Sequence, residues 1–176
     1  MSIRDNSNRY GQVSRVLHWG IAILLLWQFS SAGAHFFLKG TSIEKFLWTT
    51  HKPLGFVLFV LILLRVAWAL ANLSRRPSAV SVAARLGHLV LYGILVIVPT
   101  LALLRQYGSG KPFEPFGISL FPGFEGDKIA WMTAPGNLLH GWLGLSLLAL
   151  VAGHIFMVVW HKRSAADSDV LPRMWR

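Results

Sequence analysis

The sequence predicts an all-α fold, an integral membrane four-helix bundle formed by a single domain that covers residues 1–176. Composition is the first observation behind this prediction. Hydrophobic residues make up 54% of the chain and charged residues only 14%, whereas a water-soluble domain carries roughly 25% charged residues. The second observation is a mean hydropathy of +0.52. A surface with so few charges is expected to face lipid rather than water.

Four apolar segments are long enough to cross the hydrocarbon layer of a membrane, which is about 30 Å thick and takes about 20 helical residues. They run over residues 16–38, 46–73, 86–104 and 138–160. Each must be a helix, because lipid offers no hydrogen-bond partner to an unpaired backbone group. The first segment lacks the cleavage site of a signal peptide, and Trp27, Gln28 and His35 interrupt it, so we expect it to stay in the protein.

The second helix is expected to begin before its most apolar part. Thr41 and Glu44 fit a capping box, in which the Thr41 side chain caps the first turn and Glu44 reaches back to the Thr41 backbone. Pro53 then lies inside this helix and should bend it, since proline has no backbone N–H for the helical ladder. Such a bend changes the direction in which His51 points.

The longest connection covers residues 105–137 and is rich in glycine and proline. Several aromatic residues are interleaved with these turn formers: Phe113, Phe116, Phe121, Phe124 and Trp131. Aromatic side chains gather at membrane interfaces, so we expect this connection to lie at the outer interface. It is either a cap over a site or an ordinary interfacial loop.

Lysines and arginines are unevenly divided between the two sides of the predicted bundle. The N-terminal flank, the connection between the second and third segments and the C-terminal tail hold ten, and the two opposite connections hold six. Positively charged flanks stay inside, so both termini are predicted on the cytoplasmic side of the membrane. The net charge of +10 fits an anionic lipid surface, and nucleic-acid binding is not expected of an embedded chain.

The chain contains no cysteine and seven histidines. Without cysteine, disulfides, iron–sulfur clusters and the covalent attachment of a c-type haem are excluded. Imidazole is then the main candidate for a metal ligand, since it binds iron, copper and zinc. Polar groups at membrane depth are costly and usually functional, so the depth and helical face of each histidine decide its role.

Four histidines match in depth. His140 and His154 lie 14 residues apart on the fourth helix, about 40° apart around it and about 21 Å apart along it. His18, near the inner start of the first helix, pairs by depth with His154. His51, near the outer start of the second helix, pairs with His140. The spacing therefore favours two metal-binding histidine pairs stacked across the membrane.

A planar cofactor between such pairs needs small residues that let the backbone approach its ring. Gly20, Gly55, Gly144 and Gly153 lie within four residues of the four histidines, although glycine also serves ordinary helix packing in membranes. With no cysteine for attachment, the cofactor is predicted to be b-type haem, two per chain, held by axial bonds and packing. The alternative for any one histidine is an interfacial or hydrogen-bonded role.

Arg65 is the other costly residue in the membrane. It lies 14 positions beyond His51 on nearly the same face of the second helix, near the depth of the inner pair. A guanidinium there needs an anionic partner, and the apolar segments hold no Asp or Glu at that depth. A haem propionate would supply one. The alternative is a side chain that extends to the inner interface.

Three histidines remain. His161, seven residues after His154, is too close to it for a further haem. It either serves a quinone, by binding a carbonyl or passing a proton, or extends into the interface. His88 opens the third helix at a similar depth, as a supporting or quinone-site residue or as a plain helix end. His35 is expected at the outer interface.

Four groups of residues carry a resemblance to a known family. They are Arg15-Val16-Leu17-His18-Trp19, His51 with Arg65, Leu86-Gly87-His88-Leu89-Val90-Leu91-Tyr92, and His140 with His154 and His161. Over nearly the whole chain, they resemble the prokaryotic cytochrome b561 family of four-helix, di-haem membrane proteins. The plan is also similar to the cytochrome b subunits of hydrogenases and formate dehydrogenases. In length and third-helix motif, the chain most resembles the superoxide oxidase type.

This resemblance implies an oxidoreductase that takes electrons from superoxide at the outer face and delivers them to ubiquinone. It implies two haems with histidine ligands and a quinone beside two further histidines. The haem ligands are His18 with His154 and His51 with His140, and the quinone residues are His88 and His161.

Lysines on the outer side would attract the superoxide anion by their charge, and another outer electron donor is the alternative. They are Lys39, Lys45, Lys52, Lys111 and Lys128. Glu114, Glu125 and Asp127 in the long connection offset part of this charge.

Two other functions fit parts of the pattern. A cytochrome b anchor would pass electrons between a soluble dehydrogenase and quinone, and it predicts co-purification with that partner. A histidine-based metal transporter would bind zinc or copper in passage, and is expected to place carboxylates or clustered ligands at one depth. The four histidines divide instead between two depths.

Overall fold

The fold was analysed in a computed structural model that describes residues 2–164 and 170–175. Over these residues the chain is helical and forms no named strand. Four long helices account for most of it: α1 (Gln12–Phe37), α2 (Ser42–Ala71), α3 (Val82–Gly108) and α4 (Ala130–Ser164). Two short helices, η1 (Pro115–Gly117) and α5 (Pro172–Trp175), complete the order. The predicted all-α class is confirmed.

The four long helices are each apolar and long enough to cross a membrane. Each begins several residues before the apolar segment that predicted it, and α4 begins eight residues earlier, at Ala130 rather than at residue 138. The difference has a simple cause. An apolar run marks only the part of a helix that faces lipid, whereas the helical hydrogen bonds continue into the interface until a cap ends them.

The start of α2 confirms one half of the predicted capping box and corrects the other. The Thr41 hydroxyl accepts a hydrogen bond from the Glu44 backbone N–H at 3.2 Å. The Glu44 carboxylate does not return to Thr41, as we predicted, but lies 2.9 Å from Nδ1 of His35. The Thr41 N–H donates instead to the Leu38 carbonyl at 3.1 Å. The tight connection brings the last turn of α1 over the first turn of α2, and this neighbour is not evident from the local sequence.

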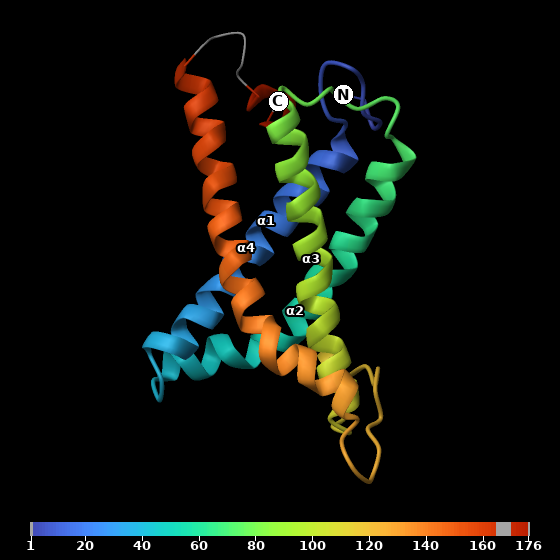
Figure 1. The fold of residues 1–176 in the computed structure, drawn as a ribbon, viewed down its shortest axis with the longest axis vertical. Helices are drawn as coiled ribbons and strands as arrows, with labels where there is room; N and C mark the ends of the chain where they lie inside the picture. Colours follow the sequence, from blue (N-terminus) through green and yellow to red (C-terminus); the bar gives the residue numbers. More distant parts are fainter. Residues whose placement is uncertain (1, 165–169, 176) are drawn as a thin grey trace.

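The helices pack mainly as two pairs, α1 with α2 and α3 with α4, and α2 also contacts α3. Pro53 lies inside α2 as predicted, and Figure 1 shows α2 changing direction within its first half. A buried apolar core joins three of the helices at mid-depth. It consists of Ile21, Leu25, Leu58, Ile62 and Leu147.

Both chain ends lie at one end of the bundle, and the long connection lies at the other (Figure 1). We call these the terminal end and the loop end. At the terminal end the N-terminal segment contacts the C-terminal helix. The Tyr10 N–H donates to the Arg173 carbonyl at 3.1 Å, and the rings of Trp19 and Trp175 are 5.1 Å apart. These contacts hold the two ends of the chain together at the terminal end.

The long connection at the loop end packs against α2 and α3. Phe113 and Phe121 pair across it, with the Phe113 N–H donating to the Phe121 carbonyl at 2.8 Å. The ring of Phe113 lies 6.1 Å from that of Phe56 on α2, and the ring of Tyr107 on α3 lies 5.4 Å from Phe121. Phe113 and Phe121 therefore anchor this segment to the two helices beneath.

Candidate functional site

Four histidine rings face one another in two pairs that join separate helices. His18 of α1 and His154 of α4 have ring centres 6.4 Å apart and planes at 71°. His51 of α2 and His140 of α4 have ring centres 6.4 Å apart and planes at 82°. The structure thus brings together both pairs that the sequence predicted by depth. Leu147, halfway between the two α4 histidines, belongs to the buried core that separates the pairs.

The separation within each pair fits two imidazoles on opposite sides of one metal ion. A metal–imidazole bond is about 2.0 Å long, and the bonding nitrogen lies about 1.1 Å from its ring centre, so such a pair has ring centres about 6.2 Å apart. The observed 6.4 Å agrees for both pairs. Each pair would thus be able to hold a haem iron between its two imidazoles.

Hydrogen bonds at the loop-end pair fix which nitrogen of each ring is available. Nδ1 of His140 lies 3.1 Å from the Val98 carbonyl. A carbonyl only accepts, so Nδ1 carries the proton and Nε2 keeps the lone pair that a metal requires. Nδ1 of His51 lies 2.7 Å from the Ser31 hydroxyl. Since that hydroxyl donates to the Gln28 carbonyl at 2.8 Å, it is free to accept from His51.

Gln28 and Ser31 are functional candidates that the sequence reasoning did not assign. Ser31 is fully buried, and the Gln28 side-chain amide donates to the His51 carbonyl at 2.9 Å. Both residues therefore support His51 from α1. Their signal was available: they are polar residues at membrane depth, three positions apart on one helical face.

One of the predicted small-residue positions serves a different purpose. A Cβ at Gly55 would lie 2.7 Å from the Gln28 amide nitrogen, so this glycine makes room for Gln28. At Gly20, Gly144 and Gly153 a Cβ would meet no protein atom within 4 Å. Those three positions are open in the structure, and their role beside a planar group stays a prediction.

A third ring stands beside the terminal-end pair. His88 of α3 and His154 have ring centres 5.5 Å apart and planes at 67°. This is shorter than the separation of two imidazoles on opposite sides of a metal, so His88 is placed as a neighbour of the pair. His161 is half-buried in the last turn of α4, the helix that also carries His154.

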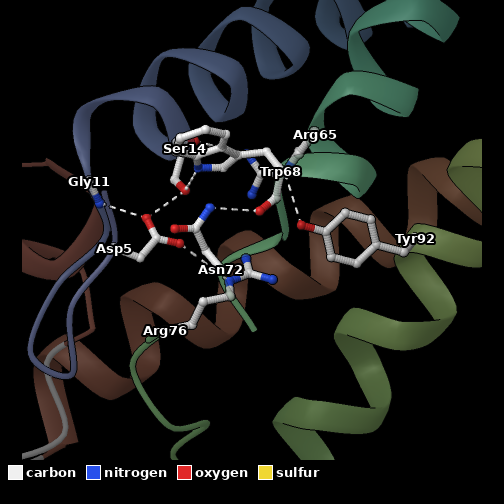
Figure 2. Close-up of polar contacts among 8 residues, drawn as sticks. All are labelled: Asp5, Gly11, Ser14, Arg65, Trp68, Asn72, Arg76 and Tyr92. Atoms are coloured by element: carbon white, nitrogen blue, oxygen red, sulfur yellow. Dashed lines mark hydrogen bonds and ion pairs between the residues drawn. The ribbon is translucent and has the colours of Figure 1, made fainter. Parts of the chain in front are cut away.

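Arg65 bonds to neutral groups rather than to a carboxylate. Its Nε donates to the Tyr92 hydroxyl at 3.1 Å, and a terminal nitrogen donates to the Ser14 carbonyl at 3.2 Å. Figure 2 shows Arg65 reaching from α2 toward Tyr92 of α3. These bonds hold the half-buried guanidinium inside the bundle, and the predicted haem propionate partner stays a prediction.

A row of rings leads from the loop-end surface to His51. His35, expected at the interface, has a 40% exposed side chain and pairs with Glu44 at 2.9 Å. Its ring stacks on Trp48 at 3.7 Å, and Trp48 lies 4.9 Å from the ring of His51. Trp48 was missed as a neighbour of the site, although its position three residues before His51 places both on one face of α2.

Over residues 2–164 and 170–175, no group of three histidine or carboxylate side chains converges as a metal site. The metal-binding capacity described above therefore rests on pairs of imidazoles. A haem iron would need only such a pair of imidazoles from the protein.

Two comparisons with known proteins agree with this geometry. A family model described as "Prokaryotic cytochrome b561" matches residues 9–176. The chain is also 30% identical, over 187 aligned positions, to cytochrome b561 homolog 2 of Escherichia coli (strain K12). That alignment covers 99% of this chain and 95% of the relative.

Proposed function

Because this chain belongs to the prokaryotic cytochrome b561 family, whose members bind b-type haem and transfer electrons in membranes, we propose that it is a di-haem superoxide:ubiquinone oxidoreductase. Electrons enter from superoxide at the loop end and leave to ubiquinone at the terminal end. One observation carries this proposal. Two histidine pairs, one toward each end of the bundle, each have ring centres 6.4 Å apart.

Histidines from separate helices would hold the two haems. His18 and His154 would bind the haem iron at the terminal end, and His51 and His140 would bind it at the loop end. The haem iron supplies reversible one-electron chemistry. The protein fixes the ligands: the Val98 carbonyl and the Ser31 hydroxyl orient the two loop-end imidazoles through their Nδ1 atoms.

The interior between the pairs is suited to electron transfer rather than to the passage of ions. The two α4 histidines are about 21 Å apart along the helix, and the side chains of Ile62 and Leu147 between these levels are 1% and 4% exposed. Such packing excludes water. A metal transporter would need a polar path at this depth.

The overall reaction balances as two one-electron oxidations and one two-electron reduction. Two superoxide anions each give up one electron and become O₂. Ubiquinone takes both electrons and two protons and becomes ubiquinol. We assign His88 and His161 to the quinone end, where an imidazole can hydrogen-bond a quinone carbonyl and pass a proton. The position of His88 beside His154 supports this assignment.

Superoxide is proposed as the donor because the lysines on the loop-end side favour approach of an anion to that surface. The Lys52 ammonium is held toward this surface by a 3.0 Å hydrogen bond to Gln106. The ten-to-six division of Lys and Arg supports an orientation in a bacterial inner membrane with the loop end outside and the terminal end, with both termini, in the cytoplasm.

The test is a pyridine haemochrome assay and a reduced-minus-oxidised spectrum of the detergent-purified protein, followed by superoxide and then ubiquinone. The proposal expects two b haems per chain that superoxide reduces and ubiquinone reoxidises. Two haems that do not respond to superoxide would instead favour the anchor for a soluble dehydrogenase. A folded protein without haem would overturn the proposal and return the histidines to metal transport.

A further inference from the structure

Asp5 is a buried carboxylate that the proposed electron transfer does not use. Its side chain has no exposed surface, although it precedes the first helix in a segment rich in polar residues. A buried charge is costly unless hydrogen bonds or an opposite charge compensate it. The contacts of Asp5 therefore indicate what this segment is built to hold.

Asp5 binds the first turn of α1. One carboxylate oxygen, Oδ1, accepts from the Gly11 N–H at 2.8 Å and from the Ser14 hydroxyl at 2.7 Å. The other oxygen lies 3.6 Å from Nε of Arg76. Gly11 is the N-cap of α1 and has no capping side chain of its own. Asp5 thus caps α1 from six residues away, where a negative charge also favours the positive end of the helix.

Ser14, which Asp5 holds, also bonds to two side chains of α2. Its hydroxyl, which donates to Asp5, accepts from the indole N–H of Trp68 at 3.0 Å. Its carbonyl accepts from Arg65 at 3.2 Å. Trp68 and Arg65 are three residues apart and so lie on the same face of α2. Figure 2 shows these contacts converging on Ser14 between the two helices.

Arg65 is held beside the terminal-end histidine pair by both of its anchors. Ser14 precedes His18 by four residues on α1, and Tyr92 follows His88 by four residues on α3. Each anchor is therefore one helical turn from a histidine at that level. The bonds to Ser14 and Tyr92 fix the guanidinium between these two points.

We propose that Asp5 is a positioning residue that, through Ser14, holds the Arg65 guanidinium beside the terminal-end histidine pair and thereby raises the reduction potential of the haem there. This inference rests on the proposed haem at His18 and His154. A nearby positive charge favours the ferrous state, which carries one positive charge fewer than the ferric state. Without Asp5 the first turn of α1 loses its cap, and Arg65 is free to extend toward the interface.

The sign of the potential change separates this mechanism from a direct effect of the Asp5 charge. Removal of a negative charge through space raises the potential, whereas release of Arg65 lowers it. Spectroelectrochemical titration of the purified holoprotein, Asp5→Ala, Arg65→Gln and the double variant measures both midpoint potentials. We expect Asp5→Ala to lower one potential only, and to cause no further lowering in the Arg65→Gln background. Asp127→Ala, which removes an exposed carboxylate at the loop end, is the matched control and should leave both potentials unchanged.

Ser14→Ala tests the same link without any change of charge. It removes the hydroxyl that joins Asp5 to Trp68 but keeps the carbonyl that Arg65 uses, so we expect a smaller lowering of the same potential. If Asp5→Ala retains no haem, the potential of the Ser14→Ala variant alone tests whether Asp5 acts on Arg65 through Ser14. A raised or unchanged potential, or a shift that adds fully to that of Arg65→Gln, would overturn the inference and leave the haem assignment intact. A haem-free wild-type protein would overturn both.

Discussion

At the scale of single residues, the site depends on which nitrogen of each histidine is left free. Hydrogen bonding at Nδ1 settles this for His140, because the Val98 carbonyl can only accept. The His51 contact with Ser31 agrees with the same tautomer. The proposed ligands and the residues that hydrogen-bond to them are therefore different, and separate substitutions can test each group.

Replacement of one ligand should remove one haem. We expect His140→Ala to lose only the loop-end haem and His154→Ala only the terminal-end haem, since the two pairs share no residue and lie about 21 Å apart along α4. Haem content per chain and the two potentials of each variant check this. Loss of both haems from a folded single variant would contradict the assignment.

His161 should behave differently from the ligands. We expect His161→Ala to retain both haems and to slow reduction of ubiquinone, because this residue is assigned to the quinone rather than to iron. Stopped-flow reoxidation of the reduced protein by ubiquinone measures the effect. Reduction by superoxide in the same variant is the internal control, and a haem missing from a folded His161→Ala protein would refute the assignment.

Ser31 is expected to tune the loop-end haem without being a ligand. Ser31→Ala leaves Nδ1 of His51 without its 2.7 Å partner in a fully buried position. Loss of such a supporting contact typically weakens metal binding about 10- to 100-fold. Competition for haem by apomyoglobin would measure retention. Ser30→Ala, next in sequence and exposed, is the control that should retain haem as the wild type does.

At the scale of elements, the packing of α1 on α2 decides how the loop-end pair is supported. Three side chains of α1 bond to two residues of α2. Trp27 donates to the Thr50 hydroxyl, and Gln28 and Ser31 both contact His51. Polar contacts of this kind join helices in a membrane, where apolar burial drives association little. The tight contact also explains why residue 55 is glycine.

Gly55→Ala should destabilise this contact. The added Cβ would lie 2.7 Å from the Gln28 amide nitrogen, which must move and weaken its bond to the His51 carbonyl. We expect a loss of about 1–2 kcal/mol in stability, as for overpacked interiors. Thermal unfolding in detergent measures it. Gln28→Ala should relieve part of the loss in the double variant, and Gly33→Ala, where a Cβ meets nothing within 4 Å, should be tolerated.

At the scale of the whole molecule, an even number of spanning helices places both termini at one end (Figure 1). The N-terminal segment, the connection between α2 and α3 and the C-terminal helix meet there through Asp5, Arg76 and Arg173. Arg173 donates to the Ser78 carbonyl at 3.1 Å, and Arg76 lies over the ring of Tyr10 at 5.3 Å. The segments at the terminal end are therefore held to one another by hydrogen bonds and ring contacts.

The orientation of the bundle can be tested directly because the chain has no cysteine. Single cysteines at Ser7 and Ser119, both exposed, mark the terminal end and the loop end. We expect a membrane-impermeant thiol reagent applied to intact spheroplasts to label Ser119→Cys but not Ser7→Cys. Labelling of both after lysis confirms that each is reactive, and the reverse pattern in intact spheroplasts would invert the proposed direction of electron flow.

The sequence by itself determined the fold class, the four helices and the two levels of histidines. Lipid permits few backbone structures, so twenty apolar residues suffice to predict a spanning helix. The fixed rise and rotation of a helix then give depth and face to His18, His51, His140 and His154. No knowledge of helix packing is needed for either step.

Tertiary structure alone decided which side chains support those histidines. The Glu44 carboxylate pairs with His35 rather than with the Thr41 backbone, Gly55 accommodates Gln28, and Asp5 reaches Arg65 through Ser14. Each of these contacts joins residues that a turn or a separate helix brings together. Their geometry depends on the bend of α2 and on how closely two helices approach, and neither quantity is encoded in the spacing of residues along one helix.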